Sequence, residues 1–110
     1  MSFSIERSDD VTVVAVDGEL TVGNRGEFKT AVIERLESGD RKFVFDFATS
    51  GYIDSSGLGV LVSLSKKIRE KGGEMRLSNL NEDLRTLFEL TKLDTLFHIA
   101  DSRDQALEDF

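Results

Sequence analysis

The chain has 110 residues, of which 39% are hydrophobic and 32% charged. This length and composition predict one folded domain over residues 1–110 and exclude a chain that is disordered throughout. Because the chain contains no cysteine, a disulfide framework, a thiol nucleophile and a cysteine-based zinc site are also excluded.

The charge is acidic, with a formal net value of −7 at pH 7. The densest basic group, Lys66, Lys67, Arg69 and Lys71, lies in a stretch with helical spacing and is predicted to form a solvated helix face. We therefore expect no direct nucleic-acid binding. The start of the chain lacks a signal-peptide pattern, and no apolar run approaches the roughly 18 residues of a membrane span. These features predict a cytoplasmic protein that does not bind a membrane.

The first elements form a predicted hairpin. Phe3 and Ile5 alternate with polar residues, and the sequence RSDD at 7–10 is typical of a turn. The segment VTVVAVDGEL at 11–20 is β-branched enough for a strand that is buried on both faces. The two segments together predict an antiparallel pair of strands at the N-terminus.

A helix and a central strand are predicted next. Asn24 followed by Glu27 resembles a capping pair for a helix over about 24–38. The apolar run KFVFDF at 42–47 is suited to a central strand. The following ATSGYID, residues 48–54, is predicted to be a loop.

Helical and extended patterns continue to the C-terminus. Apolar residues over 58–68 have helical spacing, and EMRLS at 74–78 predicts another strand. Asn81 is a candidate cap for a third helix, and LFHIA at 96–100 predicts a short extended piece. A last short helix is predicted to begin with a cap at position 101 or 102.

Alternating strands and helices imply right-handed parallel crossovers. The predicted class is therefore α/β, with a mixed and mostly parallel sheet of about four to five strands. Helices are expected to pack on this sheet, and the first strand of the N-terminal hairpin is expected to run antiparallel.

The candidate site is YIDSSGLGVL, residues 52–61, at the carboxyl end of a predicted parallel strand, where ligands gather in such sheets. Helix capping by Asp54 or Ser55 explains part of this sequence. It does not explain Gly57 and Gly59, each of which costs about 1 kcal/mol relative to alanine inside a helix. A serine hydroxyl beside uncovered backbone suits close approach by another molecule. That molecule is a small ligand, a substrate for a nucleophile, or a protein.

A serine hydrolase is the first enzymatic alternative. Ile53 stands where a nucleophile elbow around Ser55 requires glycine. The chain has one histidine, His98, and its position between Phe97 and Ile99 is more typical of a packed or edge-strand side chain than of a catalytic base. The pattern therefore argues against a hydrolase and predicts no catalytic residue.

Two phosphate-related alternatives are weaker still. Val62 stands where a dinucleotide-binding loop has its third glycine, although an anion at this helix N-terminus remains an open alternative. Asp46 ends a strand, as the acceptor of a phospho-aspartate receiver domain would. The pair Asp9 and Asp10 precedes its strand, so the acidic pair that would hold Mg²⁺ is missing. We expect no metal and no cofactor.

The sequence resembles a known family. Three segments carry the resemblance: VDGEL, DFATSGYIDSSGLGVLVSLSKKI and GGEMRLSNLNEDLRTLFELTKLDTLFHI. They are similar to segments of the anti-sigma factor antagonists of bacteria, which are single-domain STAS proteins. This resemblance covers nearly the whole chain. It implies that the serine directly after the aspartate, Ser55 after Asp54, is phosphorylated by an anti-sigma factor that is also a serine kinase. Ser56, the runner-up, is then expected to be a helix cap.

The resemblance also implies how the protein works. The unphosphorylated form would bind the anti-sigma factor and release a sigma factor, and a separate serine phosphatase would restore that form. Two other classes are left open. One is a STAS scaffold or transporter-accessory subunit without a phosphorylation cycle, and the other is a domain that binds or hydrolyses nucleotides at the bare helix N-terminus near Gly57 and Gly59. The chain is expected to be a monomer or a weak dimer.

The partner-binding surface implied by the resemblance surrounds Ser55. Two residues there depart from the family, because Thr21 replaces a common acidic residue and Ser50 replaces an apolar one. The residues expected to contact the partner are Asp54, Ser56, Gly57, Leu58, Gly59, Thr21 and Asn24.

Overall fold

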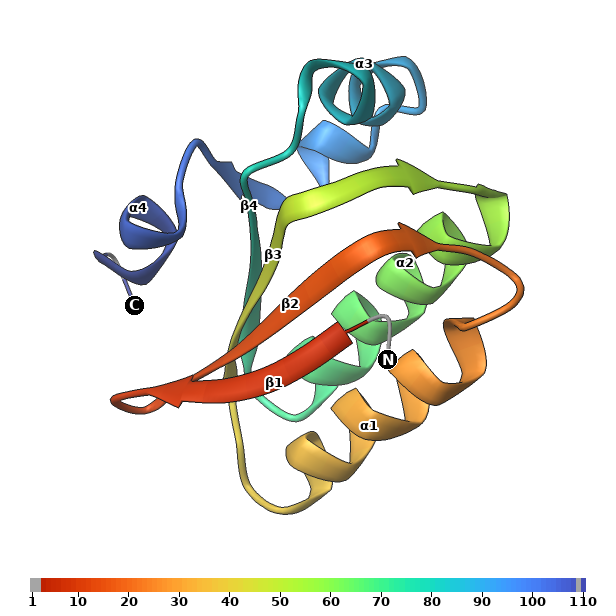
Figure 1. Ribbon diagram of the computed structural model, residues 1–110. Coiled ribbons are helices and arrows are strands. Elements are labelled where there is room, and N and C mark those ends of the chain that lie inside the picture. Colours follow the sequence, from red (N-terminus) through yellow and green to blue (C-terminus); the bar gives the residue numbers. More distant parts are fainter. Residues whose placement is uncertain (1–2, 109) are drawn as a thin grey trace.

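Five strands form one sheet in the order β1-β2-β3-β4-β5, as the computed structural model in Figure 1 shows for residues 3–108 and 110. β1 runs antiparallel to β2, and β2, β3, β4 and β5 run parallel to one another. The predicted α/β class, with its mixed sheet and antiparallel N-terminal strand, is confirmed. The strands are β1 (Phe3–Ser8), β2 (Val11–Leu20), β3 (Lys42–Ile53), β4 (Glu74–Ser78) and β5 (His98–Ala100).

Helices cover both faces of the sheet. α1 and α2 lie against one face and α4 against the other, while α3 lies beyond the end of β4 (Figure 1). The four helices are α1 (Arg25–Glu37), α2 (Ser55–Glu70), α3 (Glu82–Leu90) and α4 (Arg103–Glu108).

Two apolar clusters explain why the central strands are hydrophobic on both sides. Val14 and Val16 of β2 point into the larger cluster, under α1 and α2. Val11 and Val13 of the same strand belong to the smaller cluster, which includes Ala106 of α4. Successive side chains of a strand point to opposite faces, so the predicted burial of β2 on both faces is confirmed for residues 11–16, whereas 17–19 are exposed.

β3 is longer than the sequence predicts, and the predicted loop over 48–54 is wrong. β4 ends opposite Asp46, but β3 continues to Ile53 by pairing with 17–20 of β2. The Ser50 hydroxyl donates to the carbonyl oxygen of Gly18 at 3.2 Å and so supports this pairing. β2 and β3 therefore extend beyond the rest of the sheet, and we call residues 17–20 with 49–53 the two-stranded arm.

The predicted capping pair of α1 is also wrong. Asn24 is the residue before the helix, but its side chain makes no capping hydrogen bond. Its Oδ1 accepts from the backbone N–H of Thr21 at 2.9 Å, and its Nδ2 donates to the carbonyl oxygen of Glu19 at 2.8 Å. The amide of Asn24 thus holds the turn between the two-stranded arm and α1, and this use competes with capping.

Two other predicted helix starts are confirmed. Oδ1 of Asn81 accepts from the backbone N–H of Leu84 at 2.8 Å and caps α3. The Ser102 hydroxyl accepts from the backbone N–H of Gln105 at 3.2 Å at the start of α4. Both are ordinary N-cap geometries that satisfy a first-turn amide.

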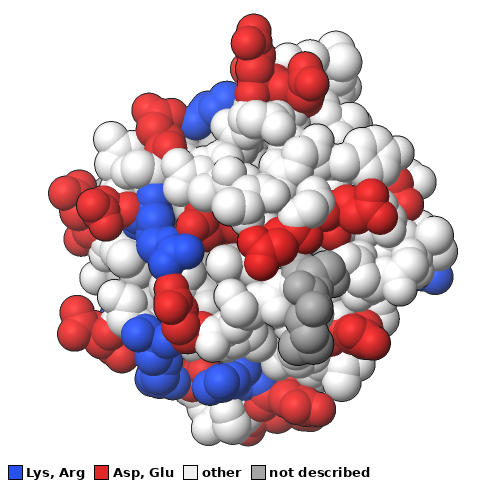
Figure 2. Space-filling model, in the orientation of Figure 1, with Lys and Arg blue, Asp and Glu red and all other residues white. Residues whose placement is uncertain are grey.

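Charged side chains are mixed over the surface. On the face drawn in Figure 2, acidic side chains lie among the basic ones and no unbroken basic stripe forms. Arg7 and Asp40 pair at 2.7 Å, and Lys42 and Asp10 pair at 2.9 Å. Within residues 3–108 and 110, no helix has the length and the apolar content that a membrane span requires.

Candidate functional site

The candidate site lies at the tip of the two-stranded arm. β2 ends at Leu20 and β3 ends at Ile53, and from these neighbouring ends the chain turns toward α1 and into α2 (Figure 1). The backbone N–H of Asp54 donates to the carbonyl oxygen of Leu20 at 3.2 Å. The arm therefore brings residues 21–24 next to the first turn of α2.

Asp54 joins these two segments. Its Oδ1 accepts from the backbone N–H of Gly57 at 2.8 Å, and its Oδ2 accepts from that of Val22 at 3.1 Å. The bond from Gly57, with those from Val22 and Ser56 and the positive charge of Arg25, lowers the pKa of this carboxyl group against the opposing effect of desolvation. Asp54 is therefore the N-cap of α2 and carries a negative charge at neutral pH.

The expectation that Ser56 caps α2 is wrong. An N-cap residue has a non-helical backbone, which Asp54 has with φ of −91° and ψ of −178°. Ser56 is the second residue of the helix and lies inside its first turn. Its hydroxyl is therefore not needed to start α2.

The structure explains the two glycines of the site, Gly57 and Gly59, in different ways. Gly57 is buried, and a Cβ atom there would lie 2.3 Å from the carbonyl oxygen of Leu20 and 2.9 Å from Cγ2 of Ile53. The expectation that Gly57 leaves the surface open is thus corrected, because this glycine lets α2 touch the end of β2. Gly59 is exposed, and a Cβ atom there would have no neighbour within 4 Å. Only Gly59 leaves the surface open.

The remaining residues that the sequence pointed to are placed as follows. Ser55 is exposed and begins α2. Leu58 is half-buried and packs against the larger core cluster. Thr21 is half-buried, and its hydroxyl accepts from the backbone N–H of Gly23 at 3.3 Å. The Ser55 hydroxyl thus faces solvent on the first turn of α2, and this turn is fixed by the hydrogen bonds of Asp54 and by the packing of Leu58.

Ser55 lines two different grooves. A groove of about 440 Å³, which we call the basic groove, separates α2 from α1 and is lined by Arg25, Lys29, Ser55, Ser56, Gly59 and Ser63. A groove of about 520 Å³, which we call the α3 groove, lies on the other side and is lined by Tyr52, Asp54, Ser55, Asp83, Leu84 and Leu87.

Several groove residues lie outside the stretch 52–61 that the sequence singles out, among them Arg25, Lys29, Asp83 and Leu87. Arg25 and Lys29 have a sequence signal, because residues four apart share one helix face. Nothing in the local sequence shows that this face of α1 borders the first turn of α2. Tyr52 was assigned to a loop, and its place in the arm leaves 56% of it exposed.

His98 has no geometric relation to Ser55. It begins β5 and pairs with Arg76, which pairs with Val44 near the start of β3. Ile53 at the other end of β3 is nine residues further on, roughly 30 Å at about 3.3 Å per residue. This separation excludes a Ser55–His98 pair.

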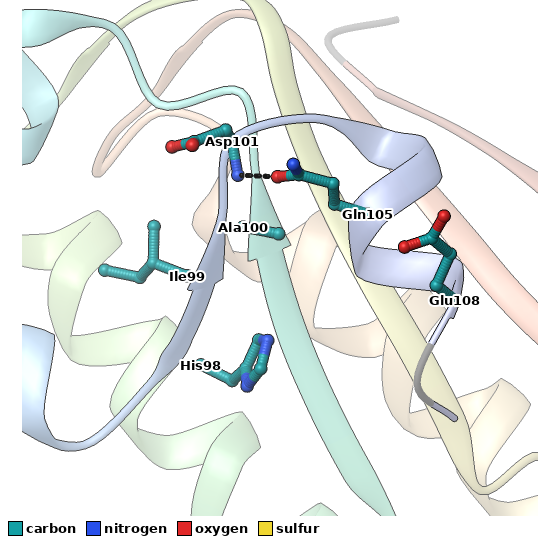
Figure 3. Close-up of a pocket in the computed structure, with 6 residues that line it drawn as sticks. All are labelled: His98, Ile99, Ala100, Asp101, Gln105 and Glu108. Atoms are coloured by element: carbon teal, nitrogen blue, oxygen red, sulfur yellow. Dashed lines mark hydrogen bonds between the residues drawn. The ribbon is translucent and has the colours of Figure 1, made fainter.

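His98 lies instead at a hollow between β5 and α4. In this hollow a hydrogen bond joins Asp101 to Gln105 (Figure 3).

Asp46 belongs to the interior and not to a phosphorylation site. Its carboxylate is buried and accepts hydrogen bonds from Asn79, Ser78 and Arg103. Among the residues that the structure describes, no group of three or more His, Asp or Glu side chains could hold a metal ion.

Known proteins resemble this chain over almost its whole length. The model of the STAS domain family matches residues 2–106. A protein of Thermotoga maritima, named as a candidate anti-sigma factor antagonist, is 33% identical over 102 residues, which are 92% of this chain and 90% of the relative. The anti-sigma-B factor antagonist of Bacillus subtilis is 28% identical over 101 residues, 91% of each chain.

A solved structure agrees with these relatives. The crystal structure of a candidate anti-sigma factor antagonist from Thermotoga maritima has a TM-score of 0.92 and 32% identity, over 97% of this chain and 92% of that one. Anti-sigma factor antagonists are non-enzymatic regulators, in agreement with the expectation that this chain is not an enzyme. The chain belongs to the STAS domain family, and within it to the anti-sigma factor antagonists.

Proposed function

We propose that this protein is the antagonist in a partner-switching pathway. Its unphosphorylated form binds an anti-sigma factor that is also a serine kinase and thereby releases a sigma factor, and phosphorylation of Ser55 blocks this binding. A serine phosphatase restores the binding form, and all of these steps take place in the cytoplasm. The observation that carries the proposal is the exposed Ser55 hydroxyl where the basic groove and the α3 groove meet.

The physics of the phosphate supports a switch between molecules. A phosphoserine adds about −1.5 to −2 charges. The first turn of α2 favours negative charge, so the phosphate leaves the domain folded. In an interface the same phosphate would lose its water and meet the carboxylates of Asp54 and Asp83. One such buried charge accounts for about 2.8 kcal/mol, or a hundredfold in affinity.

The α3 groove offers the contacts for the anti-sigma factor. Tyr52 is 56% exposed beside Leu87, and Val22, on the other side of Asp54, is 66% exposed. Exposed aromatic and aliphatic side chains around a reactive group are typical of the centre of a protein interface. We therefore place the partner over Ser55 and the α3 groove.

Tyr52→Ala is expected to weaken binding of the anti-sigma factor about tenfold or more, because a truncated aromatic anchor costs at least 1 to 2 kcal/mol. Titration calorimetry with the cognate kinase measures this loss. Leu90→Ala is the matched control, since Leu90 is 77% exposed on α3 and does not line the groove. Equal affinity of both variants and the wild type would place the interface elsewhere.

The proposed function is tested with the cognate kinase and ATP. We expect peptide mass mapping to locate one phosphate on Ser55. Ser55→Ala is expected to bind the kinase and stay unmodified, whereas the phosphorylated protein loses at least a hundredfold in affinity. Phosphate on Ser56 would contradict the assignment of the residue. Absence of any phosphate, with binding intact, would favour the scaffold class, and undiminished binding of the phosphorylated protein would contradict the switch.

A further inference from the structure

The two grooves beside Ser55 differ in charge. The charged residues that line the α3 groove are both acidic, Asp54 and Asp83. Those that line the basic groove are both basic, Arg25 and Lys29. A dianion attached to Ser55 is therefore repelled on one side and attracted on the other.

The two cations are available for a new partner. Arg25 and Lys29 lie four residues apart in α1, so they share one face of that helix. Within residues 3–108 and 110, neither side chain has a hydrogen bond or an ion pair. The charge of Arg25 already acts on the carboxylate of Asp54, the residue directly before Ser55. The field of this side chain thus reaches the start of α2.

From this geometry we infer that a phosphate on Ser55 is bound within its own chain by Arg25 and Lys29 in the basic groove. The inference rests on the proposed phosphorylation of Ser55. The guanidinium group of Arg25 donates two parallel hydrogen bonds to phosphate oxygens, and the ammonium group of Lys29 supplies a point charge. The phosphate then joins α1 to the first turn of α2.

This arrangement explains how a phosphate can stay beside Asp54. The carboxylate of Asp54 is ionised by its hydrogen bonds from Gly57 and Val22. A dianionic phosphate and the carboxylate of Asp54 carry about −3 charges together, and Arg25 and Lys29 reduce this total to about −1. The phosphate also occupies Arg25 and Lys29, which in the unphosphorylated protein remain free for acidic groups of a partner.

The test needs neither a kinase nor an anti-sigma factor. Phosphoserine is placed at position 55 during synthesis of the full chain by suppression of an amber codon, and phosphorus NMR follows the second ionisation of the phosphate with pH. Nearby cations favour the dianion and lower its pKa. We expect the double variant Arg25→Gln/Lys29→Gln to raise this pKa by about half a unit relative to the wild-type chain. The difference should shrink in about 1 M salt, where the Debye length is about 3 Å.

The matched control is Lys66→Gln/Lys67→Gln, which removes the same charge from exposed positions in the middle of α2. This control is expected to change the pKa by a small fraction of that half unit. An equal shift in both double variants, or no shift in either, overturns the inference. A second measurement is thermal unfolding, in which the phosphate should raise the midpoint of the wild type but not of the Arg25→Gln/Lys29→Gln variant. A phosphorylated protein that still binds its kinase would contradict the proposed function and leave these two results unchanged.

Discussion

Replacing Gly57 by alanine is expected to lower the free energy of unfolding by about 3 kcal/mol. The new Cβ atom would lie 2.3 Å from the carbonyl oxygen of Leu20, a backbone atom that cannot rotate away, and 2.9 Å from Cγ2 of Ile53. To relieve this contact α2 must move away from the end of β2. This movement strains the hydrogen bond from the backbone N–H of Asp54 to the carbonyl oxygen of Leu20. Urea denaturation followed by circular dichroism measures the loss, and the thermal midpoint should fall by roughly 10 °C or more.

Gly59→Ala is the control for this prediction, and its effect has the opposite sign. Gly59 lies in the same helix, two residues further on, with no neighbour within 4 Å of a Cβ atom. Alanine there is expected to stabilise the helix by up to about 1 kcal/mol. Equal stabilisation by both substitutions would show that helix propensity, and not contact with Leu20, governs these positions.

The sequence predicted the succession of strands and helices along the chain because each element depends on a local pattern. The β-branched segment 11–20 is hydrophobic at nearly every position near its start, which requires cover on both faces. Helical spacing over 58–68 identified α2 for the same reason. Neither prediction needs information from a distant part of the chain.

The sequence did not predict the second half of β3. Residues 48–52 are small or polar for the most part, and their extended form depends on pairing with 17–20, about thirty residues away. The bond from the Ser50 hydroxyl to Gly18 is part of that pairing. Such a contact becomes visible only when both segments have been placed.

Within the candidate site, the structure revises the roles that the sequence suggested for the cap and for Gly57. The order Asp54, Ser55, Ser56 leaves three candidates for the cap, and the extended backbone at Asp54 decides among them. The packing role of Gly57 depends on the carbonyl oxygen of Leu20, which only the two-stranded arm brings near. The basic groove requires two helices side by side, and the sequence does not specify how α1 and α2 face one another.

The second large effect is expected at Asp46, away from the candidate site. Its side chain is 5% exposed and accepts hydrogen bonds from Asn79 Nδ2 at 2.8 Å and Ser78 Oγ at 3.2 Å, and it pairs with Arg103 Nη2 at 2.7 Å. Asp46→Ala leaves these donors without their acceptor and is expected to lower the free energy of unfolding by about 4 kcal/mol. Because Arg103 belongs to α4, the loss should include fraying of that helix, measured by faster amide hydrogen exchange in α4.

The same carboxylate makes stability depend on pH. Burial alone would raise the pKa of Asp46, but the hydrogen bonds from Asn79 and Arg103 and the charge of Arg103 outweigh it and lower the pKa. The folded state then binds fewer protons than the unfolded state, whose aspartate has a pKa of about 3.9. This stabilisation is present at pH values above the pKa of the unfolded state. It is lost as the pH falls through that pKa toward the lower pKa of the folded state.

The prediction is tested by urea titrations between pH 7 and pH 3. Asp46→Asn should lose less stability on acidification than the wild type, while Asp104→Asn, at an exposed position of α4, should follow the wild-type curve. Parallel curves for Asp46→Asn and the wild type would show that the Asp46 carboxylate is not the group whose protonation destabilises the fold.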